Sequence, residues 1–346
     1  MAWRIPEIHM AHVPKYEKVK TLILADIKSG VYRPGDRIPT REQLVEKYSV
    51  TRTTVGQALK ILVNAGVLST SKRGGTIVTG KSMPLKVAFI SVLGEAGADD
   101  IMRASEAENY GIFKPLLEAG SEFDLDFIDI KDLSPSDFKW TSKYDCMVWV
   151  MPGEKFLCKL PEYSNKALVI NRYHKDINFI STNHRQAVRE MTEYNLKLAG
   201  KDCQVFFLEN ARQNDFIYRE RREGFVDACE RAGKFYRFYD LSVSDYTSMQ
   251  DALLRIEFEK DKNIVMVSPG LAYTGAVLQM AQRRGLVFGE NFFYSDFDNR
   301  HSLRNTGIKI VSAIQDYNAM GRELLMALRR FGEEKIQLFV PYEIIK

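Results

Sequence analysis

The sequence contains few cysteines, no long apolar run and little excess charge, and each absence excludes a class of protein. Its 346 residues include four cysteines, Cys146, Cys158, Cys203 and Cys229, with no CxxC pair and no histidine cluster beside them. We therefore expect neither a zinc site nor a disulfide framework, and reduced thiols fit a cytoplasmic protein. No apolar run reaches the roughly 18 residues of a membrane span, and the charged N-terminus lacks a secretion signal. No metal or cofactor is expected.

The small net charge, +4, is unevenly distributed. Residues 1–80 contain 13 Lys/Arg and 6 Asp/Glu, which gives +7, whereas the remainder contains 36 and 39, which gives −3. A basic first fifth on a mildly acidic body indicates that one end meets a polyanion, although a solvated charged surface explains the charge equally well. A chain of this length is expected to form two or three compact units.

The first 79 residues show the element order of a winged helix. The apolar spacing and turn signals predict helices over 16–27, 40–48 and 51–65, followed by short strands over 67–70 and 76–78. A capping box at Thr40 opens the second helix, and Thr51 can cap the third. We therefore predict an α+β winged helix-turn-helix domain over 1–79 and a linker over 80–84.

Residues 85–346 alternate strands with amphipathic helices. The predicted strands are 85–93, 125–130, 146–150, 167–170, 204–208, 264–267, 292–295 and 308–313. The predicted helices are about 101–119, 185–199, 216–232, 246–260, 272–284 and 317–331. This alternation indicates parallel, doubly wound α/β sheets in two lobes. We expect lobe 1 at about 85–200 and 309–330, lobe 2 at about 201–308 and 331–346, and crossovers near 200–204, 300–308 and 330–335.

The predicted helix over 51–65 carries residue types that suit a DNA interface. A helix N-terminus directs N–H groups and side chains at bases and phosphates in the major groove. Arg52 can fork onto guanine or phosphate, and short threonine hydroxyls reach phosphate oxygens. The candidate DNA-binding residues are Arg41, Thr51, Arg52, Thr53, Thr54, Gln57, Arg73, Gly74 and Gly75. Taken singly, each candidate has a simpler explanation as a helix cap, a hairpin turn or solvated surface. For Lys60, on the same predicted helix, we favour solvated surface.

Four segments of this region carry a family pattern. They are 27–42 (IKSGVYRPGDRIPTRE), 50–62 (VTRTTVGQALKIL), 64–68 (NAGVL) and 74–78 (GGTIV). Together they make residues 15–79 resemble the GntR family of bacterial regulators. The resemblance implies DNA contacts by Arg41, Arg52, Thr53, Thr54 and a glycine of the wing. Gly56 stands where the family usually has a larger, often basic residue, so Gln57 is expected to take part of that role.

The rest of the chain carries a second, more degenerate pattern. Its segments are 85–91 (LKVAFIS), 169–172 (VINR), 180–183 (ISTN), 221–225 (RREGF), 293–298 (FYSDFD) and 311–315 (VSAIQ). Residues 85–346 thereby resemble LacI-type regulators and periplasmic sugar-binding proteins. The resemblance implies a two-lobed, type I periplasmic-binding-protein-like domain, and a GntR head on such a body is the architecture of arabinose-type repressors.

The candidate effector-binding residues are those that suit sugar recognition. Planar bidentate groups bind sugar hydroxyls, and ligands of parallel sheets sit at the carboxyl ends of the strands. The candidates are Arg221, Asp298, Gln315, Asn183, Arg172, Ser91 and Glu95. Arg221 could instead belong to a charged helix face and Asp298 could cap a turn, but we favour a binding role for these two.

The expected ligand is a monosaccharide, with fucose or arabinose as first examples. Ser268-Pro269 stands where the family usually has Asn-Asp, so the sugar cannot be transferred from relatives, and a nucleoside or a sugar phosphate stays open. The resemblance implies a homodimeric repressor of a carbohydrate operon whose affinity for a double-stranded DNA operator changes with ligand. An activator is the alternative sign of regulation.

Two other classes of protein compete with a regulator. No nucleophile elbow, P-loop, dinucleotide fingerprint or HExxH motif is present, so no catalytic residue is predicted and an enzyme is disfavoured. The third class is an architectural DNA-binding protein without an effector, for which an apolar-filled junction between the lobes would argue.

Overall fold

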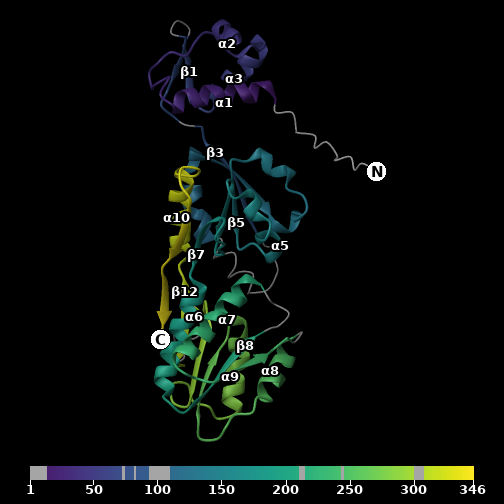
Figure 1. Cartoon of the computed structure of the whole chain (residues 1–346), viewed down its shortest axis with the longest axis vertical. Coiled ribbons are helices and arrows are strands. Elements are labelled where there is room, and N and C mark those ends of the chain that lie inside the picture. Colours follow the sequence, from purple (N-terminus) through teal and green to yellow (C-terminus); the bar gives the residue numbers. More distant parts are fainter. Residues whose placement is uncertain are drawn as a thin grey trace, which may run out of the picture. The chain divides into compact units, whose positions relative to one another are not determined.

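The computed structural model describes residues 14–71, 75–81, 83–92, 110–209, 215–242, 245–299 and 308–346 (Figure 1). The chain divides into two compact units, Met1–Leu85 and Lys86–Lys346, which we call the head and the body. In the described part of the chain, no helix has the length and apolar character needed to cross a membrane.

The head has the predicted winged-helix order. It consists of α1 (Lys15–Lys28), α2 (Arg41–Tyr48), α3 (Arg52–Asn64) and a hairpin of β1 (Leu68–Ser71) and β2 (Gly75–Val78). The capping box at Thr40 is present, since its hydroxyl accepts from the Gln43 backbone N–H while the Gln43 side chain accepts from that of Thr40. Val55, Leu59 and Leu62 on α3 are buried in the same core cluster as Leu44 of α2. This apolar stripe fixes which face of α3 points outward.

The body contains two six-stranded sheets, each the centre of one lobe. The first lobe has the strand order β13-β7-β6-β5-β3-β4, and the second has β14-β12-β11-β10-β8-β9. The first sheet comprises β3 (Leu85–Ser91), β4 (Phe123–Asp129), β5 (Cys146–Val150), β6 (Ala167–Ile170), β7 (Asn178–Thr182) and β13 (Gln337–Val340). The second comprises β8 (Cys203–Glu209), β9 (Tyr236–Asp240), β10 (Asn263–Val267), β11 (Phe292–Phe297), β12 (Ile310–Gln315) and β14 (Tyr342–Ile345).

The helices of the body are α5 (Glu154–Leu157), α6 (His184–Ala199), α7 (Phe216–Arg231), α8 (Tyr246–Leu254), α9 (Thr274–Arg283), α10 (Tyr317–Arg329) and a helical segment at 110–118. Short 3₁₀ turns lie at Gly120–Glu122, Ile130–Asp132, Lys139–Lys143, Leu160–Tyr163 and Leu271–Tyr273. Alternation along β8 shows the layering of the second lobe. Val205 and Phe207 join the core cluster of α6 and α7, whereas Phe206 and Leu208 join that of α8 and α9. The sheet is therefore buried on both faces.

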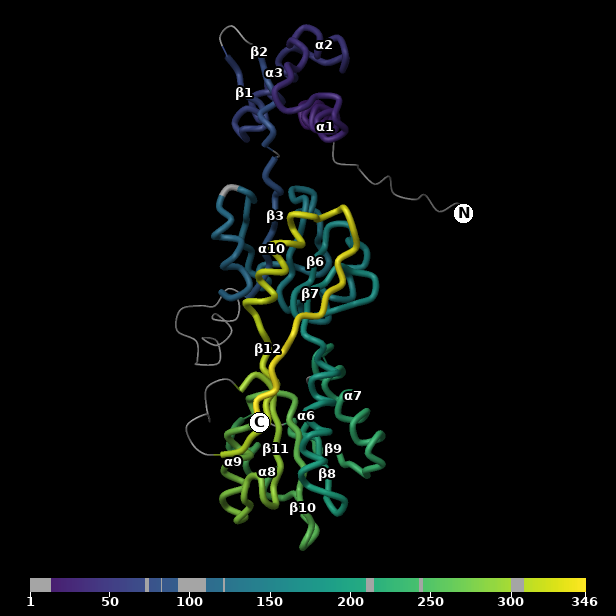
Figure 2. Tube along the Cα trace, turned by 90° about the vertical axis from the view of Figure 1, so that its left-hand side faces the viewer, coloured from purple at the N-terminus to yellow at the C-terminus, as the bar shows by residue number. Residues whose placement is uncertain are grey.

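The strand pairing corrects the expected division of the lobes. β12 pairs in parallel with β11, so residues 310–315 belong to the second lobe and not, as expected, to the first. β13 pairs with β7 and belongs to the first lobe, whereas α6 packs in a core cluster of the second. The chain therefore changes lobe between Thr182 and His184, between Gln315 and Tyr317, and between Val340 and Tyr342, not near 200, 300 and 330 (Figure 2). The pairing of buried strands determines where the chain passes from one lobe to the other. The polar segments near 200, 300 and 330 do not mark these passages.

Candidate DNA interface and ligand site

The first turn of α3 is shaped by two threonines. The Thr51 hydroxyl accepts a hydrogen bond from the Thr54 backbone N–H at 3.2 Å and lies 2.8 Å from the Thr54 hydroxyl. Thr51 is thus the predicted N-cap, and it remains exposed. The first helical residue, Arg52, is 73% exposed, and its Nη2 lies 3.2 Å from a carboxylate oxygen of Glu42 on α2. A surface ion pair of this kind is worth at most about 1 kcal/mol, so Arg52 can exchange it for a phosphate or a base.

The other predicted DNA-binding residues surround this turn. Arg41 begins α2 and is exposed, as are Thr53 and Gln57 on α3, whereas Thr54 is half-buried. Gly75 begins β2 with φ +75°, a conformation that favours glycine. Arg73 and Gly74 lie outside the described residues. The described candidates on α2 and α3 are therefore exposed or half-buried, and Gly75 lies beside the turn of the hairpin.

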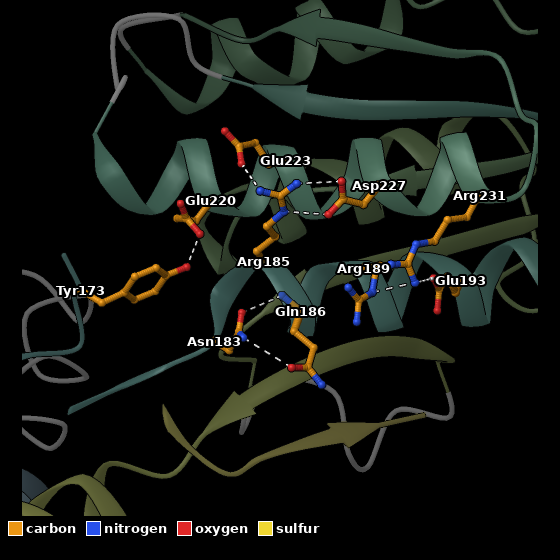
Figure 3. Close-up of polar contacts among 10 residues, drawn as sticks. All are labelled: Tyr173, Asn183, Arg185, Gln186, Arg189, Glu193, Glu220, Glu223, Asp227 and Arg231. Carbon is orange, nitrogen blue, oxygen red and sulfur yellow. Dashed lines mark hydrogen bonds and ion pairs between the residues drawn. The ribbon is translucent and has the colours of Figure 1, made fainter. Parts of the chain in front are cut away.

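Arg221, the principal ligand candidate, is fixed by the close packing of α7 on α6. Gly224 lies one turn after Arg221, and a β-carbon there would stand 2.1 Å from the backbone carbonyl oxygen of Arg185 on α6. The Arg185 guanidinium donates to both carboxylate oxygens of Asp227, at 2.7 and 2.9 Å, and to Glu223 at 2.6 Å (Figure 3). The Arg-x-x-Gly-Phe motif thus sets the position of the helix that carries Arg221.

The Arg221 guanidinium lies in a buried polar setting, and the side chain is 9% exposed. It stacks on Phe297 with its carbon 3.6 Å from the ring centroid, and its Nη1 donates to the carbonyl oxygen of Pro269. Its Nη2 lies 3.4 Å from Nδ1 of His184, whereas its Nε has no partner in the described ranges. Burial lowers the pKa of Arg221, because the charged form has lost water.

His184 and Asn171 connect Arg221 to the first lobe. Asn171 follows β6, and its Oδ1 lies 3.1 Å from Nε2 of His184 at the start of α6. Burial, and then the charges of Arg221 and Arg172, hold the pKa of His184 well below its usual value. The ring is therefore neutral, and because Nδ1 accepts from Arg221, Nε2 carries the proton and donates to Asn171. Sequence reasoning missed both residues.

Arg172 lies beside this chain of contacts. It is half-buried, and its Nη1 donates to the backbone carbonyl oxygen of Asn171 at 2.8 Å. Burial lowers the pKa of Arg172 to about 10. The structure therefore brings Arg172 and Arg221, which sequence reasoning proposed separately, to one site at the junction of the lobes.

Asp298 and Gln315 form a second network. Asp298 has φ +63°, and its carboxylate accepts from the Gln315 backbone N–H at 3.1 Å, from the Gln315 side-chain amide and from the Tyr317 hydroxyl at 3.1 Å. The Gln315 Oε1 atom is buried, and no described residue forms a hydrogen bond with it. Because Asp298 directly follows Phe297, on which Arg221 stacks, the two networks meet at the carboxyl end of β11.

Asn183 and Ser91 are less directly placed. The Asn183 side chain caps α6 by accepting from the Gln186 backbone N–H at 3.0 Å, so it also has a structural role at the lobe connection (Figure 3). Ser91 ends β3, and its buried hydroxyl has no partner within the described residues. Glu95 lies outside the described residues.

Ser268-Pro269 forms part of a buried network. The Ser268 hydroxyl is 2.7 Å from the Tyr294 hydroxyl, which is 3.0 Å from that of Thr274, and Thr274 donates to Asp296. Burial raises the pKa of Asp296, whose side chain is fully buried. The Ser268 hydroxyl is therefore bonded within a buried polar network of the second lobe.

Two further contacts join the lobes beside Arg221. The Tyr173 hydroxyl of the first lobe donates to the Glu220 carboxylate on α7 (Figure 3). Arg219 Nη2 lies 3.2 Å from a Glu154 carboxylate oxygen on α5. The site thus combines a set of buried polar groups with interlobe contacts that opening of the lobes would break.

The head is similar to known bacterial regulators. Residues 15–78 match the model described as bacterial regulatory proteins, gntR family. Similar proteins include the uncharacterized HTH-type transcriptional regulator YurK of Bacillus subtilis, 43% identical over 81 residues, and the histidine utilization repressor of Klebsiella aerogenes, 44% identical over 68. These matches cover 23% and 20% of this chain and 33% and 28% of the relatives. The chain thus spans about a third or less of the curated relatives it matches, and the GntR resemblance is confirmed for the head.

Solved structures match the body. A regulatory protein of the LacI family from Chloroflexus aggregans has a TM-score of 0.59 and 12% identity and covers 75% of this chain and 96% of its own. The trehalose repressor from Escherichia coli has a TM-score of 0.57 and 11% identity, with coverage of 75% and 99%. At such identities the likeness concerns the fold alone, and it confirms the predicted two-lobed, LacI-like body.

Proposed function

We propose that this chain is a cytoplasmic transcriptional repressor, a homodimer whose head binds an operator and whose body binds a monosaccharide. The observation that carries the proposal is the exposed, basic first turn of α3 on a head that matches the gntR pattern. The repressor names of proteins similar to the head and to the body support regulation over catalysis.

The site at the lobe junction supports a small polar ligand. Arg221 Nε and Gln315 Oε1 are a buried donor and a buried acceptor without partners among the described residues, and such atoms normally find one. Arg172 and Asp298 add a further fork of donors and a pair of acceptors, which is the chemistry that sugar hydroxyls need. We take fucose and arabinose as the first monosaccharides to test.

Regulation then follows from a two-state body. A ligand that bridges residues of both lobes favours their closed arrangement. In a dimer, closure changes the spacing of the two heads, so they no longer match half-sites one DNA turn apart. A coupling of about 1–3 kcal/mol would lower operator affinity 5- to 150-fold.

The test measures ligand and operator binding together. Operators are selected from random duplexes with the intact chain, and their affinity is measured by fluorescence anisotropy with and without each member of a monosaccharide panel. We expect at least one sugar that binds in calorimetry to weaken operator binding. A sugar that binds yet leaves DNA affinity unchanged would contradict the switch, and a chain that selects no duplex would contradict the regulator.

A further inference from the structure

Two arginines at the lobe junction lack a carboxylate partner in the part of the chain that the structure describes. Arg221 is buried and Arg172 half-buried, and neither forms an ion pair with any described residue. The surface arginines of the same helix behave differently, since Arg222 pairs with Glu209 at 3.1 Å and Arg219 with Glu154 at 3.2 Å. Buried cations are normally paired because the loss of water otherwise costs several kcal/mol.

The nearest carboxylates serve other groups. Asp298 accepts hydrogen bonds from Gln315 and Tyr317. Asp215 caps α7 by accepting from the Tyr218 backbone N–H at 3.1 Å. Their charges favour the charged forms of Arg221 and Arg172, but neither carboxylate reaches a guanidinium in an ion pair. Within the part of the chain that the structure describes, carboxylates thus compensate the positive charge of the site only at a distance.

The unused hydrogen-bonding capacity points the same way. Among the described residues, the buried Nε–H of Arg221 has no acceptor, and the Arg172 guanidinium donates to a single neighbouring carbonyl. His184, the side chain between them, is neutral and provides no negative charge.

We propose that the effector of this protein carries an oxyanion, a carboxylate or a phosphate, which binds Arg221 and Arg172, in addition to hydroxyls that bind at Asp298 and Gln315. The inference rests on the proposed function, because it defines the ligand class of the same site. A planar guanidinium binds either oxyanion through two parallel hydrogen bonds, which supplies the acceptors that the site lacks. A sugar acid or a sugar phosphate has this chemistry, and a neutral sugar does not.

Matched ligands test the proposal. Calorimetric titrations of the intact chain use neutral monosaccharides, the aldonic acid of each, the terminal phosphate ester of each, and inorganic phosphate as the simplest probe. We expect at least one anionic member to bind about tenfold or more tightly than its neutral parent. Its identity distinguishes carboxylate from phosphate. If neutral parents bind as tightly as their anions, or if no anion in the panel binds, the proposal is wrong.

Variants of the arginines complete the test. Arg221→Gln and Arg172→Gln each remove a charge, and we expect each to weaken binding of the anionic ligand about tenfold or more, and by a larger factor than it weakens binding of the neutral parent. Arg222→Gln is the control, because that side chain is exposed and paired with Glu209 outside the cluster. Arg172→Gln keeps the test valid should Arg221→Gln fail to fold. If both cluster variants bind the anion as tightly as the wild-type chain does, the assignment of the oxyanion to Arg221 and Arg172 is wrong.

The outcome can be separated from the fate of the proposed function. Operator affinity is measured in the same solutions by anisotropy. If a neutral sugar releases the operator, the oxyanion proposal is wrong and the proposed repressor function is supported. An anion that binds through Arg221 without any effect on DNA supports the site and contradicts the switch.

Discussion

At the scale of single residues, His184 shows how burial creates a group that sequence alone does not reveal. The side chain has no distinctive motif around it, and its partners, Asn171 and Arg221, are distant in sequence. Arg221, Asp298 and Gln315 could be predicted because they lie in recognisable segments at strand ends or on a patterned helix. His184 and Asn171 could not, because their roles depend on the approach of β6 to α6.

His184 gives a prediction about pH. In the unfolded chain His184 has a pKa of about 6.5, whereas in the folded chain its pKa is well below that value. Below about pH 6.5 the unfolded state therefore binds more protons than the folded state. This residue therefore contributes stability above about pH 6.5 that is lost as the pH falls. His184→Gln keeps a donor for Asn171, and we expect its free energy of unfolding to fall less steeply with acid.

Urea denaturation of both proteins over a series of pH values measures the effect. His174→Gln is the matched control, because the His174 side chain is 40% exposed. Parallel curves for the wild-type chain and His184→Gln would show that His184 is not held neutral.

At the scale of elements, the buried strands of the body were predictable except for β7, whereas among its described edge strands only β4 was predicted. β5 and β6 are fully buried apolar runs, and their predicted bounds agree with the structure. β9 and β13 lie at sheet edges with mostly exposed or half-buried side chains, so neither has a clear apolar pattern. The prediction for α8 extended to about 260, but the helix ends at Leu254. Ile256 and Phe258 continue the apolar pattern and pack on the core without being helical, which explains the error.

The contact between α6 and α7 gives a prediction at this scale. Gly224→Ala places a β-carbon 2.1 Å from the Arg185 backbone oxygen, so the helices must separate. We expect a loss of about 1–3 kcal/mol or more in the free energy of unfolding, with weaker ligand binding because Arg221 moves with α7. Gly153→Ala is the control, since no atom lies within 4 Å of the β-carbon added there. Chemical denaturation measures both, and equal stability of the two variants would contradict the close contact.

At the scale of the whole molecule, the two domains were predictable and the path between the lobes was not. The helix caps and hairpin of the head and the strand-helix alternation of the body are local patterns. The lobe connections at Asn183, Asp316 and Pro341 are single residues between elements, so they leave no linker-like composition to find. Only the pairing of β12 with β11 and of β13 with β7 defines them.

The tie between Tyr173 and Glu220 gives a prediction at this scale. Tyr173→Phe removes the donor from a half-buried carboxylate, and we expect a loss of about 1–3 kcal/mol in the free energy of unfolding. A double-mutant cycle with Glu220→Gln should give a coupling energy of about 0.5 kcal/mol or more. Additive effects of the two substitutions would show that the lobes are not joined by this bond.

The most direct measurement of the central claim is the affinity of the intact chain for duplex DNA as a function of salt. We expect affinity to fall steeply between about 50 and 200 mM salt, as counterion release requires. Arg52→Ala should cost about 1–3 kcal/mol of binding without loss of fold, because Arg52 is exposed, whereas Lys60→Ala on the same helix should bind nearly as the wild type. DNA binding that is absent, insensitive to salt or unchanged by Arg52→Ala would contradict a DNA interface at the first turn of α3.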